Sequence, residues 1–346
     1  MKKIIWINLS KKLRKSGVQI YNDNLKNIIG SKFKILNLYP LYKANFFPKF
    51  FEKYITKYFK INDLCKKYNT SYVVLPDESF LIVGILLALQ KKKPIIIIHD
   101  YKNMEIIKKI SFVEKIKYFL LLPFFFFLNN FHYVITVSKT SESILKKRYK
   151  INRILTIYNL FKNKKKKKNY KYSKINKQKI ILNISNDLSH KNFFVILKSL
   201  KKISNVLLIK IGKPMIKSLR NKYKKYINMN QLNVKLVNEV SHNSLNNYYK
   251  KCDLYVNPSY HEGFGRTNIE ALMHKKNVIC SDIKINREIL KNNVSYVKNF
   301  MSEDAWAKKI NNFFLKRKVY SKFKNNYLIS KNKNKYRYKL YNIFNS

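Results

Sequence analysis

The chain has 346 residues, with 73 Lys and Arg against 18 Asp and Glu, a formal net charge of +55, and a hydrophobic content of 46%. This length and hydrophobic content exclude a disordered chain and indicate two domains of ordinary size. The three cysteines, Cys65, Cys252 and Cys280, lie far apart. Their spacing excludes a disulfide framework and a cysteine-based metal site, and it fits a reducing compartment.

The positive charge has two interpretations. Lys is spread over nearly every segment, and Asn, Ile, Tyr and Phe are abundant while Gly and Pro are rare. An AT-rich coding sequence would produce this joint bias, and we favour that origin over a surface selected for polyanions. In either case the charge should draw the protein to anionic surfaces in a salt-dependent way. No specific nucleic-acid partner is expected.

The first half of the chain alternates apolar runs with helical patterns. The four consecutive isoleucines after Pro94 are typical of a parallel strand buried on both faces, and Ser138 favours the N-cap of a helix. This alternation predicts a doubly wound parallel sheet. The expected strands are 4–8, 33–38, 71–75, 94–98 and 132–137, and the expected helices are 18–29 and 80–89.

The alternation stops between residues 159 and 179, where Lys164 to Lys168 are consecutive. Like charges repel and extend a chain, so we interpret residues 161–178 as a solvated linker rather than a nucleic-acid signal. A second alternation follows, with expected strands at 179–184, 206–211, 234–237, 253–256 and 277–280 and expected helices at 192–203, 244–250 and 303–314. The predicted domains are 1–160 and 179–315, with a helical tail, 316–346, that packs back on the first domain.

Residues 261–270 are the most informative segment, because they hold two of the six glycines and two of the scarce carboxylates. Their pattern predicts a loop that leads into a helix, where backbone N–H groups approach a ligand. Glu262 precedes the glycines, and its carboxylate is suited to accept hydrogen bonds from the hydroxyls of a ligand. Glu270 has two interpretations: a ligand-binding carboxylate, or the N3 residue of a capping box with Thr267 as N-cap.

Several candidate site positions follow the ends of expected strands: His99, Asp100, Ser138, Gly212 and the Glu262 loop. Ligands of open parallel sheets bind at the carboxyl ends of the strands. With two such domains, we expect a site in a cleft between them.

From Pro258 to Leu272 the chain resembles the EGFG-x4-EA signature of retaining GT-B glycosyltransferases, especially glycosyltransferase family 4. Residues 182–192 resemble the family's glycine–arginine–lysine phosphate segment, and residues 277–289 resemble the strand and acidic loop after the signature. The resemblance implies a GT-B fold, in which two Rossmann-like domains face each other across a cleft. The first domain would lie on the acceptor side, and the second would bind a nucleotide-sugar.

The resemblance also implies roles for the residues of the signature. Glu262 would hold hydroxyls of the donor sugar, and Glu270 would hold the nucleotide ribose. Backbone N–H groups of the loop and helix start would face the diphosphate and sugar. These donor-binding positions are Gly263, Phe264, Gly265 and Thr267.

Further roles follow outside the signature. Lys191 would neutralise the departing diphosphate, with Asn186 in the same donor-binding segment. His99 would line the donor-sugar pocket, and Gly17 would let the first loop approach the donor. Asp100 is a candidate base toward the acceptor. The family retains the anomeric configuration and needs no metal, so we expect no metal and no cofactor besides the nucleotide-sugar substrate.

The chain departs from the family pattern at three places. Ser185-Asn186 replaces Gly-Arg, Lys275-Lys276-Asn277 replaces Gly-x-Pro, and Gly17 stands where paired glycines are usual. Asn lacks the charge and fork of a guanidinium, so phosphate neutralisation is expected to depend on Lys191 or on another basic residue. A degenerate scaffold that binds membrane or nucleic acid is therefore an alternative, as is a GT-B phosphorylase or epimerase.

The expected activity is transfer of a hexose to a hydroxyl of a cell-envelope glycan or glycolipid. Residues 115–131 combine basic and aromatic side chains, which favours a buried helix or a face that contacts an anionic membrane. The apolar run at residues 119–128 is interrupted by Pro123 and is too short to span a bilayer, and the apolar start is too short for a signal peptide. We therefore expect a cytoplasmic protein with a possible site of contact at the inner face of the plasma membrane.

Overall fold

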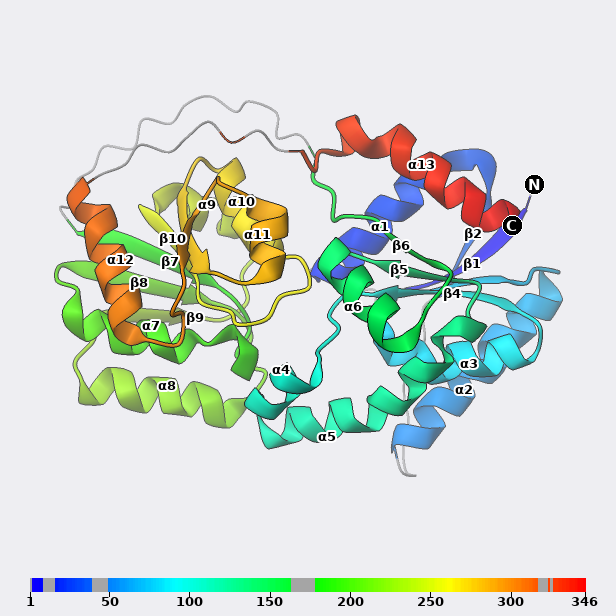
Figure 1. Cartoon of the computed structure of the whole chain (residues 1–346), viewed down its shortest axis with the longest axis horizontal. Helices are drawn as coiled ribbons and strands as arrows, with labels where there is room; N and C mark the ends of the chain where they lie inside the picture. The colour runs from blue at the N-terminus through cyan, green and yellow to red at the C-terminus, as the bar shows by residue number, and fades with distance from the viewer. Residues whose placement is uncertain (1, 9–15, 39–48, 163–177, 317–322, 324–325) are drawn as a thin grey trace. The chain divides into compact units, whose positions relative to one another are not determined.

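The computed structural model describes residues 2–8, 16–38, 49–162, 178–316, 323 and 326–346. It divides into two compact α/β units, each with a six-stranded parallel sheet (Figure 1). The first unit comprises Met1–Tyr101, Ile116–Asn163 and Asn326–Ser346, and the second comprises Lys102–Lys115 and Lys164–Asn325. The prediction of two doubly wound parallel sheets is confirmed.

The sheet of the first unit has the order β2-β1-β3-β4-β5-β6. Its strands are β1 (Lys3–Ile7), β2 (Lys34–Leu38), β3 (Tyr72–Leu75), β4 (Lys93–Ile98), β5 (Tyr133–Thr136) and β6 (Ile154–Thr156). All but β6 follow the predicted pattern. The isoleucines of β4 are fully buried, as expected for a central strand covered on both faces.

The helices of the first unit begin with local signals that the sequence carries. Ser16 caps α1 through a capping box with Gln19, and Ser138 caps α6 as predicted. These helices and 3-10 turns are α1 (Gly17–Ile29), η1 (Gly30–Lys32), α2 (Lys49–Lys67), η2 (Glu78–Phe80), α3 (Leu81–Leu89), η3 (Leu122–Asn130), α6 (Lys139–Tyr149) and α13 (Ile329–Asn345). Helix α5 (Phe112–Leu121) crosses the boundary between the two units at Ile116.

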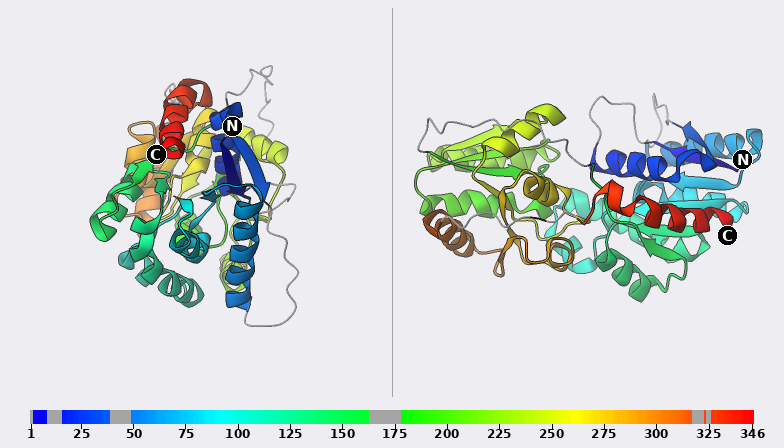
Figure 2. Two further views of the ribbon diagram at one scale, coloured as in Figure 1. Left: turned by 90° about the vertical axis from the view of Figure 1, so that its right-hand side faces the viewer. Right: turned by 90° about the horizontal axis from the view of Figure 1, so that it is seen from above.

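The carboxyl-terminal helix α13 packs along α1 (Figure 2). Arg337 Nε donates to the Ile28 carbonyl, and the Tyr341 hydroxyl donates to the Ile29 carbonyl, at the carboxyl end of α1. Leu340 and Phe344 are buried against the unit. The end of the chain is therefore part of the first unit.

The sheet of the second unit has the order β12-β11-β10-β7-β8-β9. Read from β9, this is the Rossmann order 3-2-1-4-5-6, whose switch point lies between β7 and β10. Its strands are β7 (Lys179–Ile184), β8 (Val206–Ile211), β9 (Val234–Val237), β10 (Leu254–Asn257), β11 (Asn277–Ser281) and β12 (Ser295–Val297).

The core of the second unit lies where α7 and α12 pack on the sheet, around Phe193, Tyr223 and Trp306. The predicted helix at 192–203 is α7 followed by the 3-10 turn η5. The helices of this unit are α4 (Met104–Lys109), η4 (Ser189–Lys191), α7 (Phe193–Ser199), η5 (Leu200–Lys202), α8 (Lys217–Met229), α9 (His242–Lys251), α10 (Arg266–Met273), α11 (Lys284–Leu290) and α12 (Glu303–Lys316).

The segment Lys102–Lys115, which we expected in the first domain, clusters with the second unit. Most of the predicted linker, including Lys164 to Lys168, lies outside the described residues. Across the described residues, no helix combines the length and the apolar character that crossing a membrane requires.

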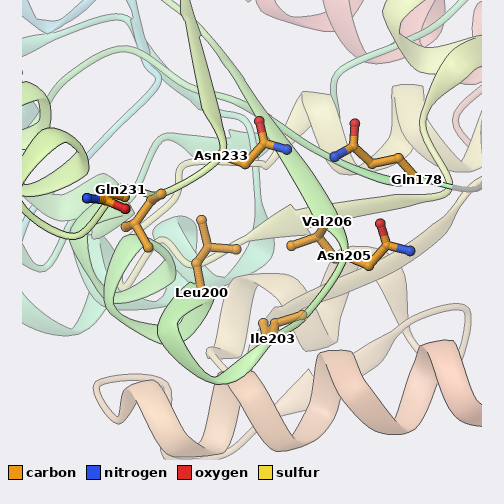
Figure 3. Close-up of a pocket in the computed structure, with 8 residues that line it drawn as sticks. Gln178, Leu200, Ile203, Asn205, Val206, Gln231 and Asn233 are labelled. Carbon is orange, nitrogen blue, oxygen red and sulfur yellow. The ribbon is translucent and has the colours of Figure 1, made fainter.

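A cavity of about 230 Å³ opens at the amino ends of β7, β8 and β9 (Figure 3). Carboxamides from the turns before these strands line it, together with apolar side chains from η5 and β8; its lining includes Gln178, Asn205, Gln231, Asn233, Leu200 and Val206. This cavity is at the opposite end of the strands from the switch-point loops.

Gly84 tests the packing of α3 on its sheet. A Cβ at this position would lie 2.2 Å from the Phe131 ring and 2.8 Å from Leu75, both in the buried core. We expect Gly84→Ala to lower the free energy of unfolding by about 1–3 kcal/mol, because overpacking outweighs the helix propensity of Ala. Urea unfolding measures this, with Leu89→Ala at an exposed position of α3 as the control. An unchanged midpoint for Gly84→Ala would contradict this packing.

Candidate functional site

The loops after β7, β8 and β10 meet at the switch point of the second sheet. Ser185 N donates to the Ile211 carbonyl, and Asp187 N donates to the Lys213 carbonyl, so the first two loops run side by side. Gly212 is required here because a Cβ would lie 1.8 Å from the Ser185 carbonyl oxygen. Tyr260 N donates to the His190 carbonyl and ties the β10 loop to η4.

Lys191 and Glu262 form an ion pair at the centre of these loops. Lys191 Nζ lies 2.9 Å from Glu262 Oε1, and their side chains are only 18% and 11% exposed. Burial alone would raise the pKa of Glu262, but the charge of Lys191 and hydrogen bonds from Lys191 and Ser259 outweigh it and lower that pKa. Glu262 is therefore a carboxylate at neutral pH. Two residues predicted separately from the sequence are thus direct partners.

A chain of buried asparagines supports the loop after β10. Asn257 Nδ2 donates to Asn268 Oδ1 at 3.0 Å, Asn268 Nδ2 to Asn286 Oδ1 at 3.4 Å, and Asn286 Nδ2 to the Ser281 carbonyl at 2.9 Å. Asn257 Oδ1 also accepts from the backbone and hydroxyl of Ser259. This network holds the backbone on both sides of Glu262, and sequence reasoning missed it.

Helix α10 begins earlier than the predicted capping box allows. Gly265 is its N-cap, with a φ of 77°, and Arg266 is its first residue, so Thr267 lies inside the first turn. The prediction of Thr267 as N-cap and Glu270 as N3 is wrong. The reason is local: Gly265 adopts the left-handed conformation that favours glycine, and a Cβ there would lie 2.9 Å from Asn268 Nδ2.

Glu270 instead faces other side chains. Arg266 Nη2 donates to Glu270 Oε1 at 3.3 Å, one helical turn away, and the Tyr249 hydroxyl donates to Glu270 Oε2 at 3.2 Å. Phe264 is buried and Gly263 is half-buried in the loop before α10. The predicted positions Gly263, Phe264, Gly265, Thr267 and Glu270 thus form one continuous turn and helix start beside Glu262.

A buried charge network lies beneath Ser185 and Asn186. Asp187 Oδ1 lies 2.9 Å from Lys210 Nζ, and Asp187 Oδ2 lies 2.5 Å from Arg220 Nε. Lys210 Nζ also donates to the Ser185 carbonyl at 2.6 Å, and Arg220 Nη2 donates to the Gly212 carbonyl at 2.7 Å. Asp187 and Lys210 are fully buried. By contrast, Asn186 is exposed and its Oδ1 accepts from Lys213 N.

The segment Lys102–Lys115 attaches to η4 through Glu114. Glu114 Oε2 accepts from Ser189 N and from the Ser111 hydroxyl, and Glu114 Oε1 lies 3.8 Å from His190 Nδ1. Burial opposes ionisation of Glu114, but the neighbouring His190 and the hydrogen bonds from Ser189 and Ser111 prevail and lower its pKa to about 2. His190 is buried beside Glu114.

Three predicted site residues belong to the first unit. His99 Nε2 lies 3.1 Å from the Pro76 carbonyl, which can only accept, so the ring proton is on Nε2. Burial lowers the pKa of His99 to about 4 despite the charges of Asp77 and Asp100, so the ring is neutral at pH 7. Asp100 is half-buried after β4. Gly17 is the first residue of α1 rather than a loop residue, and residues 9–15 before it lie outside the described chain.

The two sheets and the switch-point loops define a protein of the GT-B class. Its structure is similar to a sucrose-phosphate synthase from Thermosynechococcus elongatus, with a TM-score of 0.74, 17% identity, and coverage of 91% of this chain and 90% of that chain. It is also similar to Anabaena HepE solved with UDP-glucose, with a TM-score of 0.71, 14% identity, and coverage of 100% and 97%. These likenesses define the fold.

The sequence comparison is more specific. Residues 163–328 match the family model described as glycosyl transferases group 1. The chain is also 32% identical over 235 residues to the O-antigen chain mannosyltransferase RfbU of Salmonella typhimurium. That match covers 63% of this chain and 60% of the relative's length. Within the described residues, no group of three or more His, Cys, Asp and Glu side chains is arranged to hold a metal ion.

Asn268 tests the asparagine chain. Asn268→Leu keeps the shape of the side chain but leaves the Asn257 donor and the Asn286 acceptor without their buried partner. We expect a loss of about 2–4 kcal/mol in the free energy of unfolding, measured by urea denaturation. Asn312→Leu, at an exposed position of α12, is the control and should be neutral. Equal stability of the two variants would mean that the chain of amides does not support the loop.

Proposed function

We propose that the protein is a retaining, metal-independent glycosyltransferase that moves a hexose from a nucleotide-diphosphate-sugar to a hydroxyl of a cell-envelope glycan or glycolipid. The observation that carries the proposal is the buried Lys191–Glu262 pair at the Rossmann switch point. The pair places a cation, which suits a diphosphate, beside a carboxylate, which can accept hydrogen bonds from sugar hydroxyls. A nucleotide-diphosphate-sugar carries these two groups next to each other. The group 1 family match over residues 163–328 supports the same reaction.

In this proposal each charge of the pair takes a different part of the donor. Lys191 neutralises the diphosphate as it leaves, and Glu262 accepts hydrogen bonds from sugar hydroxyls. Glu270 accepts from the ribose, while the backbone N–H groups near Gly265 and Thr267 face the diphosphate. Neutral His99 contributes a hydrogen bond to the donor sugar, and Asp100 lies toward the acceptor.

The proposed chemistry is a single exchange of bonds at the anomeric carbon. The bond between that carbon and the diphosphate oxygen breaks, and a bond to the acceptor oxygen forms on the same face of the sugar. The acceptor proton passes to the departing phosphate. The chain's own contribution is electrostatic, because Lys191 and the loop amides stabilise charge that develops on the leaving group.

Glu262→Gln tests this assignment. The amide keeps the shape but loses the charge that pairs with Lys191, so we expect kcat to fall at least about 100-fold. The measurement is release of nucleoside diphosphate from a panel of UDP-, GDP- and ADP-sugars with an envelope glycan extract as acceptor. Glu303→Gln, on α12 of the same unit, is the matched control. Wild-type turnover in folded Glu262→Gln, checked by thermal unfolding, would refute the assignment.

We also propose that the first unit contacts an anionic membrane through the apolar surface of α5 and η3. Large apolar side chains are exposed on these two elements: Phe119 by 69%, Phe126 by 67%, Leu120 by 50%, and Ile116 and Phe127 by 47% each. Exposing so many adjacent apolar side chains to water is unfavourable for a free surface. The buried-helix alternative accounts for Phe125 and Leu128 but not for these residues.

Basic residues adjoin this apolar surface. The Phe126 ring packs on Tyr149 of α6 with centroids 5.0 Å apart, and the Arg148 guanidinium lies 5.8 Å from the Tyr149 ring centroid. Lys146 and Lys147 precede it in the exposed last turn of α6. Apolar side chains flanked by cations are the composition that binds anionic lipid surfaces, and a lipid-linked acceptor would be presented there.

The double variant Phe119→Ser, Phe126→Ser tests the membrane contact. We expect its binding to vesicles of phosphatidylglycerol and phosphatidylcholine to weaken about 10-fold or more, because two exposed aromatic side chains that would enter the lipid surface are lost. Phe59→Ser, at a 57% exposed position of α2, is the control. Vesicle flotation measures the effect. Wild-type binding by the double variant, or equal loss in the control, would contradict the proposed surface.

A further inference from the structure

Lys210 is an unusual residue for the place where it lies. It is the one charged residue in β8, whose other five residues are apolar, and its side chain is fully buried. Its Nζ contacts the Ser185 carbonyl, the Ser185 hydroxyl at 3.3 Å and Asp187 Oδ1. Its ammonium therefore faces the loop that precedes Lys191.

The negative charge of Asp187 alone does not explain why Lys210 is buried. Asp187 already has a cation, because Arg220 Nε lies on its other oxygen. A second buried cation leaves this network with one excess positive charge, and burying a charge without a counter-charge is costly. An anion above the network would compensate for that cost.

The position of the network indicates where that anion would lie. Ser185 and Asn186 occupy the place of the Gly-Arg pair in the family's phosphate segment, and Asn186 carries no charge. Lys210 holds the backbone of Ser185 directly. The charge of Lys191 is near enough to be among the causes that lower the pKa of Lys210.

We infer that Lys210 is a positioning residue that supplies, from beneath the loop, the positive charge toward the donor diphosphate that Asn186 lacks. This inference rests on the proposed function, because it takes the ligand of the loop to be a nucleoside diphosphate. Asp187 and Arg220 hold Lys210 in place, and Lys210 itself does not touch the donor.

The inference predicts a specific pH dependence. Burial, followed by the charges of Arg220 and Lys191, lowers the pKa of Lys210 to about 8, although Asp187 opposes this. Its ammonium contacts Ser185, Asp187 and the face of the Phe193 ring, and the charges of Arg220 and Lys191 act on it. Tyr223 packs on the Phe193 ring. As pH rises through about 8, Lys210 loses its proton and the diphosphate loses a favourable charge. Binding of the diphosphate should then restore that proton.

Titration calorimetry with UDP and GDP from pH 7 to 9.5 tests this on the full chain. Wild-type affinity should fall as pH passes about 8, and buffers of different ionisation enthalpy should reveal proton uptake on binding. Lys210→Met should bind about 10-fold more weakly at pH 7 and show no proton uptake, because one unit charge near the phosphates is lost. Its thermal stability should be retained, since Asp187 keeps Arg220. Lys225→Met, on the exposed face of α8, is the control with the same loss of charge.

Lys210→Arg gives a second test that does not depend on how Lys210→Met folds. Arginine keeps its charge over this range, so affinity should stay high and independent of pH. Wild-type pH dependence in Lys210→Arg, or wild-type affinity in Lys210→Met, would overturn the inference. If Lys191→Met still weakened nucleotide binding in that case, the proposed function would stand. Absence of UDP and GDP binding by the wild-type chain would instead count against the proposed function itself.

Discussion

The ion pair between Lys191 and Glu262 is the constraint on which the second unit's site depends. The two residues come from loops on opposite sides of the switch point, and both are largely buried. Neither charge could be buried there without the other, because removing one partner leaves an uncompensated charge. A hydrogen bond from Tyr260 N to the His190 carbonyl joins the two loops, and the asparagine chain supports the loop that carries Glu262. These contacts hold the two opposite charges close enough together to offset the cost of burying them.

The elements and the site differ in how far the sequence predicts them. Strands such as β4 and β8 are visible as apolar runs because a strand buried on both faces needs little else. Glu262 and Lys191 are visible singly, through a resemblance, but their contact joins residues 71 positions apart and has no local signal. The start of α10 was predicted incorrectly because Thr267 and Glu270 have the spacing of a capping box. The left-handed Gly265 and the Asn268 side chain beside it decide the start instead.

Composition explains why other parts of the site were missed. Asn is common throughout this chain, so the buried residues Asn257, Asn268 and Asn286 do not stand out in the sequence. Lys is equally common, yet Lys210 carried a usable signal, since it is the only charge in an otherwise apolar strand. A biased composition therefore hides functional polar residues where they are surrounded by similar ones, and reveals them where they interrupt a buried strand.

The same bias bears on the anion site that we propose for a chain with a net charge of +55. Exposed lysines attract any polyanion and are screened by salt, so they cannot define a position. The carboxylates are few, and three of them, Asp187, Glu262 and Glu114, lie in or against the switch-point loops with basic partners from other elements. Each one fixes a cation or a histidine at a set place and partly removes it from water. Under the proposed function, the rare acidic residues, rather than the abundant basic ones, would determine where the anion is recognised.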